Sequence, residues 1–189
     1  MKGVIVQATS DRPQAPAADA PIGAELENLE ILVVDDSYHM RRLLRTLLQV
    51  LKVRHVREAE NGADALAALQ SSITDVVLAD CQMQPVDGIQ LAQMIRRSDK
   101  LPNPAVPIIM ISGHSSPELI VRARDVGVHE FLLKPVSAAS LQERILSVLS
   151  RPRPFVRTAG YVGPCRRRRD RRNYNGPERR GSDRAEKTD

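Results

Sequence analysis

Five short apolar runs, separated by segments with helical spacing, constrain the fold of this chain more than any other feature. Each run is rich in Val, Ile or Leu, and most end at a polar or turn residue. Apolar runs without alternation are typical of strands buried on both faces, which occur in parallel sheets covered by helices. The runs are residues 31–34, 53–56, 76–79, 106–111 and 129–133.

The segments between the runs carry apolar residues three or four positions apart, the spacing of a helix with one buried face. Strands alternating with helices, joined by right-handed crossovers, predict an α/β fold: a doubly wound (βα)5 sandwich around a parallel sheet. The helical stripes are Met40, Leu43, Leu44, Leu47, Leu48 and Leu51; Ala65, Leu66 and Leu69; Leu91, Met94 and Ile95; Leu119, Ile120 and Ala123; and Leu141, Ile145, Val148 and Leu149.

In such sheets the functional crevice lies at the carboxyl ends of the strands. Three carboxylates are expected to converge there, and like charges this close need a compensating cation. Mg²⁺ fits, because one or two carboxylates, waters and a phosphate commonly hold it. A lysine and a hydroxyl complete a site for phosphoryl transfer to a protein carboxylate. The residues just after the runs are Asp35, Asp36 and Ser37; Asp80; Ser112, Gly113 and His114; and Lys134 and Pro135.

This arrangement resembles the receiver domain of bacterial two-component response regulators over about residues 30–150. Five motifs, in order and at the ends of their runs, carry the resemblance. It implies the flavodoxin-like strand order 2-1-3-4-5. The motifs are Ile31-Leu32-Val33-Val34-Asp35-Asp36-Ser37, Val76-Val77-Leu78-Ala79-Asp80, Asp87-Gly88, Ile111-Ser112 and Phe131-Leu132-Leu133-Lys134-Pro135.

The resemblance also implies how a phosphoryl site is organised. Asp80 matches the phosphoacceptor, which also contacts the metal. Asp36 matches the direct Mg²⁺ ligand, and Asp35 matches the partner that acts largely through water. Gln82 stands where the family contributes a backbone carbonyl to the metal.

The remaining matches concern the response to phosphorylation. Ser112 matches the hydroxyl that turns toward the phosphoryl group, and Lys134 matches the lysine that pairs with it. Phe131 matches the aromatic switch that swings inward on activation. The bond between Lys134 and Pro135 matches one that is usually cis.

Two positions depart from the family pattern. The family usually has proline four residues after the acceptor, where this chain has Gln84 followed by Pro85. Phe131 replaces the commoner tyrosine and has no hydroxyl. For His114, two residues after Ser112, a modest effect on dephosphorylation and an exposed loop histidine without a role both stay open.

Charge divides the chain unevenly. Residues 1–150 contain 15 basic and 18 acidic residues, a net charge of −3, whereas residues 151–189 contain 13 and 5, a net charge of +8. We expect a disordered leader over residues 1–27, a receiver domain over residues 28–150, and an Arg-rich disordered tail over residues 151–189.

The tail contains a repeat, in which Tyr161-Val-Gly-Pro-Cys-Arg-Arg is echoed by Tyr174-Asn-Gly-Pro-Glu-Arg-Arg. Similar Gly-Pro-x-Arg-Arg tails occur on stand-alone receivers. Three interpretations remain: a solubilising tail, a docking element for an acidic protein, and a nucleic-acid arm, since clustered arginines suit phosphates.

Together these features predict a single-domain response regulator in phosphorelay signal transduction. It would accept a phosphoryl group from a sensor histidine kinase or a histidine phosphotransfer protein and then bind a downstream protein effector. It would not be an enzyme beyond self-phosphotransfer and slow autodephosphorylation. The alternative is a nucleic-acid-binding regulator whose basic tail is the effector and whose receiver gates it.

The expected location is cytoplasmic, with no membrane partner. No apolar run approaches the roughly 20 residues of a membrane helix, and the first residues lack the pattern of a secretory signal. The two cysteines, Cys81 and Cys165, have no metal-binding spacing and form no disulfide framework.

Overall fold

The computed structural model describes residues 24–150, 152–158 and 160–165. Most of the expected disordered leader and the last 24 residues of the tail, 166–189, lie outside this part of the chain. Within the described residues, no helix combines the length and apolar character needed to cross a membrane.

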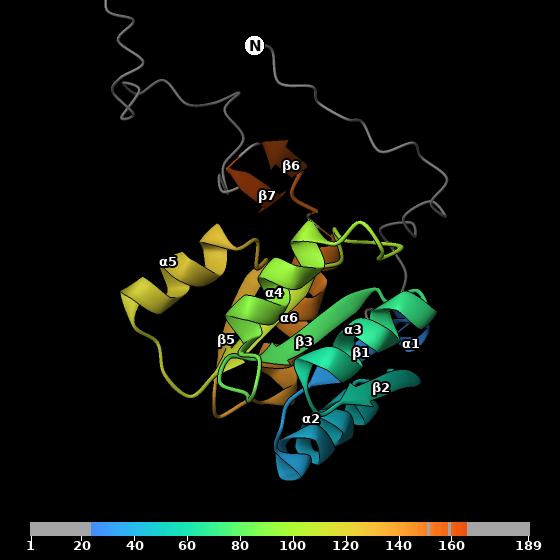
Figure 1. The fold of residues 1–189 in the computed structure, drawn as a ribbon. Coiled ribbons are helices and arrows are strands. Elements are labelled where there is room, and N and C mark those ends of the chain that lie inside the picture. Colours follow the sequence, from blue (N-terminus) through green and yellow to red (C-terminus); the bar gives the residue numbers. More distant parts are fainter. Residues whose placement is uncertain (1–23, 151, 159, 166–189) are drawn as a thin grey trace, which may run out of the picture.

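Five strands form one sheet in the order β2-β1-β3-β4-β5, with every neighbouring pair parallel (Figure 1). This confirms the flavodoxin-like order and places the carboxyl ends of all five strands at one edge. The strands are β1 (Glu30–Val34), β2 (His55–Ala59), β3 (Val76–Asp80), β4 (Ile108–Ser112) and β5 (Glu130–Leu133).

Helices cover both faces of the sheet, and several begin at a polar cap. Asp87, for example, accepts a hydrogen bond from the backbone N–H of Gln90, whose side chain bonds back to the N–H of Asp87. The helices are α1 (Ala24–Glu27), α2 (Tyr38–Val50), α3 (Gly62–Ser71), α4 (Gly88–Arg97), α5 (Pro117–Asp125) and α6 (Ala138–Ser150).

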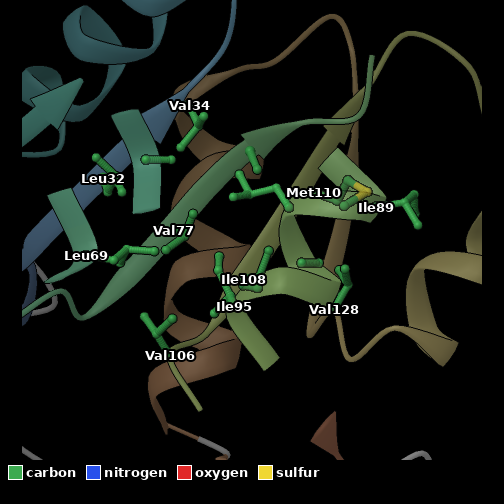
Figure 2. Packing of buried hydrophobic residues seen from close by; sticks show 14 of the residues in the cluster. Leu32, Val34, Leu69, Val77, Ile89, Ile95, Val106, Ile108, Met110 and Val128 are labelled. Atoms are coloured by element: carbon green, nitrogen blue, oxygen red, sulfur yellow. The ribbon is translucent and has the colours of Figure 1, made fainter. Parts of the chain in front are cut away.

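The central strands bury both faces, as their unbroken apolar runs predict. Alternate residues of β1, β3 and β4 point into two separate clusters. The cluster in Figure 2 joins these strands to α3, α4 and α5, and includes Leu32, Val77 and Met110. The other joins them to α2 and α6, and includes Val33 and Ile109. The sheet is therefore the middle layer of a three-layer sandwich.

The folded domain begins earlier than the predicted start at residue 28. Leu26, on the short helix α1, is fully buried in the cluster with α2 and α6. Its neighbour Glu27 contributes a backbone carbonyl that accepts from the N–H of Arg54. These contacts tie the segment before β1 to the domain.

Strands β2 and β4 begin two residues later than the apolar runs suggest, because the first residues of those runs serve other contacts. The N–H of Val53 donates to the carbonyl of Leu48 at 3.0 Å, closing α2 after Lys52, which has a positive φ of 65°. Ahead of β4, the carbonyl of Val106 accepts from the Arg96 guanidinium at 2.9 Å.

A β-hairpin follows α6, in a region expected to be disordered. It consists of β6 (Phe155–Thr158) and β7 (Tyr161–Pro164), paired antiparallel (Figure 1). The Tyr161 hydroxyl donates to the carbonyl of Pro164 at 2.6 Å, so the tyrosine of the first Tyr-x-Gly-Pro copy folds back along its own strand.

The hairpin packs on the domain rather than standing free. A Cβ on Gly163 would lie 2.7 Å from the Cα of Gly127, so the two backbones are in direct contact. The ring of Phe155 lies 5.7 Å from the guanidinium carbon of Arg96, and Arg153 donates to the carbonyl of His129. The chain from residue 152 to 165 thus differs from the expected disordered tail, because the domain supplies a surface on which it orders.

Candidate functional site

Two buried carboxylates and one lysine meet at the carboxyl edge of the sheet. Asp35 directly follows β1, Asp80 ends β3, and Lys134 directly follows β5. The Lys134 Nζ lies 2.7 Å from Oδ1 of Asp80 and 3.5 Å from Oδ2 of Asp35. The two aspartates are 1% and 5% exposed, respectively, so water does little to screen their charges.

The buried pair carries an excess of negative charge. Burial raises the pKa of Asp35, and the charge of Asp80 adds to that rise, although the N–H of Ser37 and the ammonium of Lys134 oppose it. Burial by itself would lower the pKa of Lys134, but the hydrogen bond to Asp80 and the charges of both aspartates raise it overall. One ammonium therefore serves two carboxylates.

The loop after β3 holds the Asp80 carboxylate in place. Oδ2 of Asp80 accepts from the N–H of Gln82 at 2.7 Å, while Oδ1 faces Lys134. The N–H of Gly88 donates to the carbonyl of Cys81 at 3.1 Å, which brings the start of α4 onto the end of β3.

Gly88 is a site-shaping residue to which the sequence assigned no role. A Cβ there would lie 2.2 Å from the carbonyl oxygen of Asp80, so only glycine fits without displacing the helix or the strand. The signal in the sequence is the Asp87-Gly88 pair, in which Asp87 caps α4 and Gly88 permits its close approach.

Asp36 and Gln82 lie at the exposed rim of the same site. Within the described chain, no group of three or more His, Cys, Asp or Glu side chains is assembled closely enough to hold a metal ion unaided. The donors nevertheless fit a hard divalent cation. Asp35 and Asp80 share a single lysine, and such an ion completes its shell with water and phosphate oxygens.

The predicted switch residues lie beside this centre. The Ser112 hydroxyl donates to the carbonyl of His114 at 2.9 Å and accepts from its N–H at 3.2 Å. Phe131 is half-buried against the cluster with α3, α4 and α5 and pairs in register with Met110. The bond between Lys134 and Pro135 is cis, as the resemblance implies, and the bond between Gln84 and Pro85 is also cis.

The sequence matches known proteins over this domain. The sequence model described as "Response regulator receiver domain" matches residues 31–146. Chemotaxis protein CheY-3 of Vibrio cholerae is 34% identical over 125 residues, covering 66% of this chain and 95% of that protein. Chemotaxis protein CheY of Pseudomonas aeruginosa is 32% identical over 123 residues, covering 65% of this chain and 98% of that protein.

Solved structures agree with the fold. Vibrio cholerae CheY4 superposes with a TM-score of 0.60 at 29% identity, covering 65% of this chain and 99% of that one. The receiver domain of a sensor histidine kinase from Pseudomonas aeruginosa, described with a magnesium ion coordinated in its active site cleft, gives a TM-score of 0.59 at 24% identity. It covers 65% of this chain and 98% of that one.

The hairpin β6–β7 lies beyond the matched residues and is an addition to the common domain. The matched part contains the five-stranded sheet except for Glu30, and every residue of the carboxylate–lysine centre. The chain therefore belongs to the response regulator receiver domain family, whose members act as phosphoacceptor switches in two-component signalling.

Proposed function

We propose that this chain is a response regulator that accepts a phosphoryl group on Asp80 and changes its affinity for a protein partner as a result. The observation that carries the proposal is the position of Lys134, 2.7 Å from Asp80 and 3.5 Å from Asp35. A buried carboxylate next to a cation and a second carboxylate has both the nucleophile and the electrostatic environment that phosphoryl transfer needs.

The donor is a phosphohistidine on a sensor kinase or a phosphotransfer protein. A carboxylate oxygen of Asp80 attacks phosphorus, the bond from phosphorus to the imidazole nitrogen breaks, and its electron pair stays on that nitrogen. The product is an acyl phosphate on Asp80. Lys134, already bonded to this carboxylate, then pairs with a phosphoryl oxygen.

Mg²⁺ would be held by the carboxylates of Asp35, Asp36 and Asp80 and by the backbone carbonyl of Gln82. When bound, it supplies positive charge that offsets the negative oxygens of the incoming group. The protein itself fixes the direction of the ligands: the N–H of Ser37 bonds to Oδ1 of Asp35 at 2.8 Å, and the N–H of Gln82 holds Asp80.

The response begins at Ser112. Its hydroxyl is bonded to the backbone of His114, so turning it toward a phosphoryl group breaks two contacts in the loop that leads to α5. Phe131 follows by moving into the space that the loop leaves. Both changes alter the face formed by α5, β5 and α6, where Ile120 and Leu133 are exposed apolar residues.

Phosphorylation by a small phosphodonor tests this assignment. In Mg²⁺ the wild-type chain should gain a single base-labile phosphoryl group by intact mass, and Asp80→Asn should gain none. Asp99→Asn, which changes an exposed carboxylate on the loop after α4, is the matched control and should label normally. Label that persists on Asp80→Asn, or labelling of wild type at full rate in excess chelator, would refute the proposal.

A further inference from the structure

A buried arginine lies directly beneath the loop that carries Asp35 and Asp36. Arg41, in the first half of α2, is only 9% exposed. Its Nη1 donates to the backbone carbonyl of Asp35 at 2.9 Å and to that of Asp36 at 3.4 Å. A single guanidinium nitrogen therefore donates hydrogen bonds to two consecutive carbonyls of the loop.

The other side of Arg41 is fixed to β2 and the turn after it. Nε lies 3.6 Å from a carboxylate oxygen of Glu58, and Nη2 lies 3.4 Å from Glu60. The Tyr38 ring lies 5.9 Å from the guanidinium carbon. Because a guanidinium is planar and presents its donors in a rigid fork, these contacts fix its orientation as well as its position.

The balance of charge indicates what Arg41 contributes. Glu58 and Glu60 offset its positive charge, so the guanidinium does little to repel a cation at Asp35 and Asp36. Its effect on the loop is therefore geometric. The carbonyls of Asp35 and Asp36 flank the α-carbon of Asp36. Hydrogen bonds to both of them therefore fix the direction in which the exposed Asp36 side chain projects.

We propose that Arg41 is a positioning residue for the metal-binding loop, aligning Asp36 with the buried Asp35 and Asp80. The inference rests on the proposed function, since it assumes that these aspartates bind Mg²⁺. Residues that hydrogen-bond to metal ligands without touching the metal commonly contribute about 10–100-fold to metal affinity, as their removal shows. Arg41 acts in this way, through backbone carbonyls rather than through the carboxylates.

The helix also supplies a matched control. Arg45, one turn after Arg41, pairs with the same Glu58 at 2.8 Å and bonds to the carbonyl of Val56. It supports the contact between α2 and β2, and its hydrogen bonds go to β2 rather than to the loop after β1. Arg45→Met therefore removes a comparable ion pair from the same scaffold while leaving the loop untouched.

The experiment measures Mg²⁺ affinity of the full unphosphorylated chain by NMR titration, following the amides of Asp36 and Gln82. Arg41→Met should raise the Kd about tenfold or more, and Arg45→Met should change it less than about twofold. Arg41→Lys keeps the charge but cannot span both carbonyls and both carboxylates, so it should weaken binding nearly as much as Arg41→Met. If Arg41→Met does not fold, Arg41→Lys provides the test in its place, because it keeps the positive charge.

The outcomes separate the two proposals. If the wild-type chain shows no Mg²⁺ binding at these amides, the proposed function fails. If the wild type binds but Arg41→Lys binds equally well, the positioning role is overturned. Equal weakening by Arg41→Met and Arg45→Met would also overturn it, because the effect would then come from the contact between α2 and β2.

Discussion

Replacing Phe155 with alanine should destabilise the whole domain, although this residue lies beyond the matched family region. Its ring covers the guanidinium of Arg96, which is only 1% exposed. Burial lowers the pKa of Arg96 to about 9, which still leaves it charged at neutral pH. The guanidinium of Arg96 donates to the carbonyls of Pro104, Val106 and Gly127, and these bonds connect α4 to the segments just before β4 and β5. Phe155 packs over this group and shields it from water.

The magnitude follows from two contributions. A cation–π contact with a desolvated cation contributes about 2 kcal/mol. A phenylalanine that is only half-buried contributes roughly 1 kcal/mol of apolar burial, about half the value for a fully buried ring. Phe155→Ala should therefore reduce the free energy of unfolding by about 2–3 kcal/mol. The free energy of docking of the hairpin sets the upper limit for the destabilisation by Phe155→Ala. If the substitution costs more than this, the hairpin detaches and Arg96 becomes hydrated.

Urea unfolding followed by far-UV circular dichroism measures this change. Arg157→Ala, on the same strand but exposed, is the matched control and should shift stability by less than about 0.5 kcal/mol. A chain ending at Cys165 should match the full chain, and a chain ending at Ser150 should lose at least as much as Phe155→Ala. Equal stability of the chains ending at Ser150 and at Cys165 would refute the reasoning.

Three further predictions concern single residues. Gly88→Ala places a Cβ 2.2 Å from the Asp80 carbonyl and should cost about 1–3 kcal/mol of stability and slow labelling, whereas Gly113→Ala, with open space around it, should do neither; equal effects would contradict the packing argument. Burial, reinforced by nearby arginines, lowers the pKa of His129 to about 3, so the unfolded chain binds the extra proton and stability should fall as pH drops from about 6.5 toward 3. In His129→Asn, denaturation curves at pH 7 and 4.5 should show a smaller difference than in wild type, and an unchanged difference would exclude His129 as the source. Lys134→Ala should keep the fold, because its ammonium pairs only with carboxylates at the edge of the sheet, but it should blunt the chemical-shift changes in β5 that follow phosphorylation. Chemical-shift changes equal to those of wild type would contradict its coupling role.

The sheet and the centre of the site could be predicted because both depend on local sequence. Strands buried on two faces need unbroken apolar runs, and a carboxyl-edge site needs polar residues directly after them. Asp35, Asp80 and Lys134 met both conditions, and the structure brings them together. The apolar run placed the start of β2 at Val53, but the strand begins at His55. An apolar residue such as Val53 can either close a helix or begin a strand, and here its N–H bonds back to α2.

The hairpin could not be predicted from its own residues. Its sequence is short and stands at the start of a tail that is rich in arginine as a whole, and composition of this kind favours disorder. Its order comes from Arg96 and Gly127, which lie far away in the sequence and become a docking surface only after the domain has folded. The repeat containing Tyr161 was visible, but nothing in it specified a partner within the same chain.

The phosphoryl site and the hairpin β6–β7 lie at opposite ends of the sheet. The site lies at the carboxyl ends of the strands, whereas the hairpin contacts Arg96 and His129 at their amino ends (Figure 1). The chain leaves the described structure at Cys165, whose N–H is held by the carbonyl of Pro154 at 2.7 Å. A phosphodonor at Asp80 and the docked hairpin β6–β7 therefore lie at opposite ends of the domain and do not compete for space. Any influence of the hairpin on phosphorylation must consequently pass through the domain, and the shortest routes are α4 and β5, which the hairpin contacts directly or at their ends, and β4, which Arg96 joins through the carbonyl of Val106.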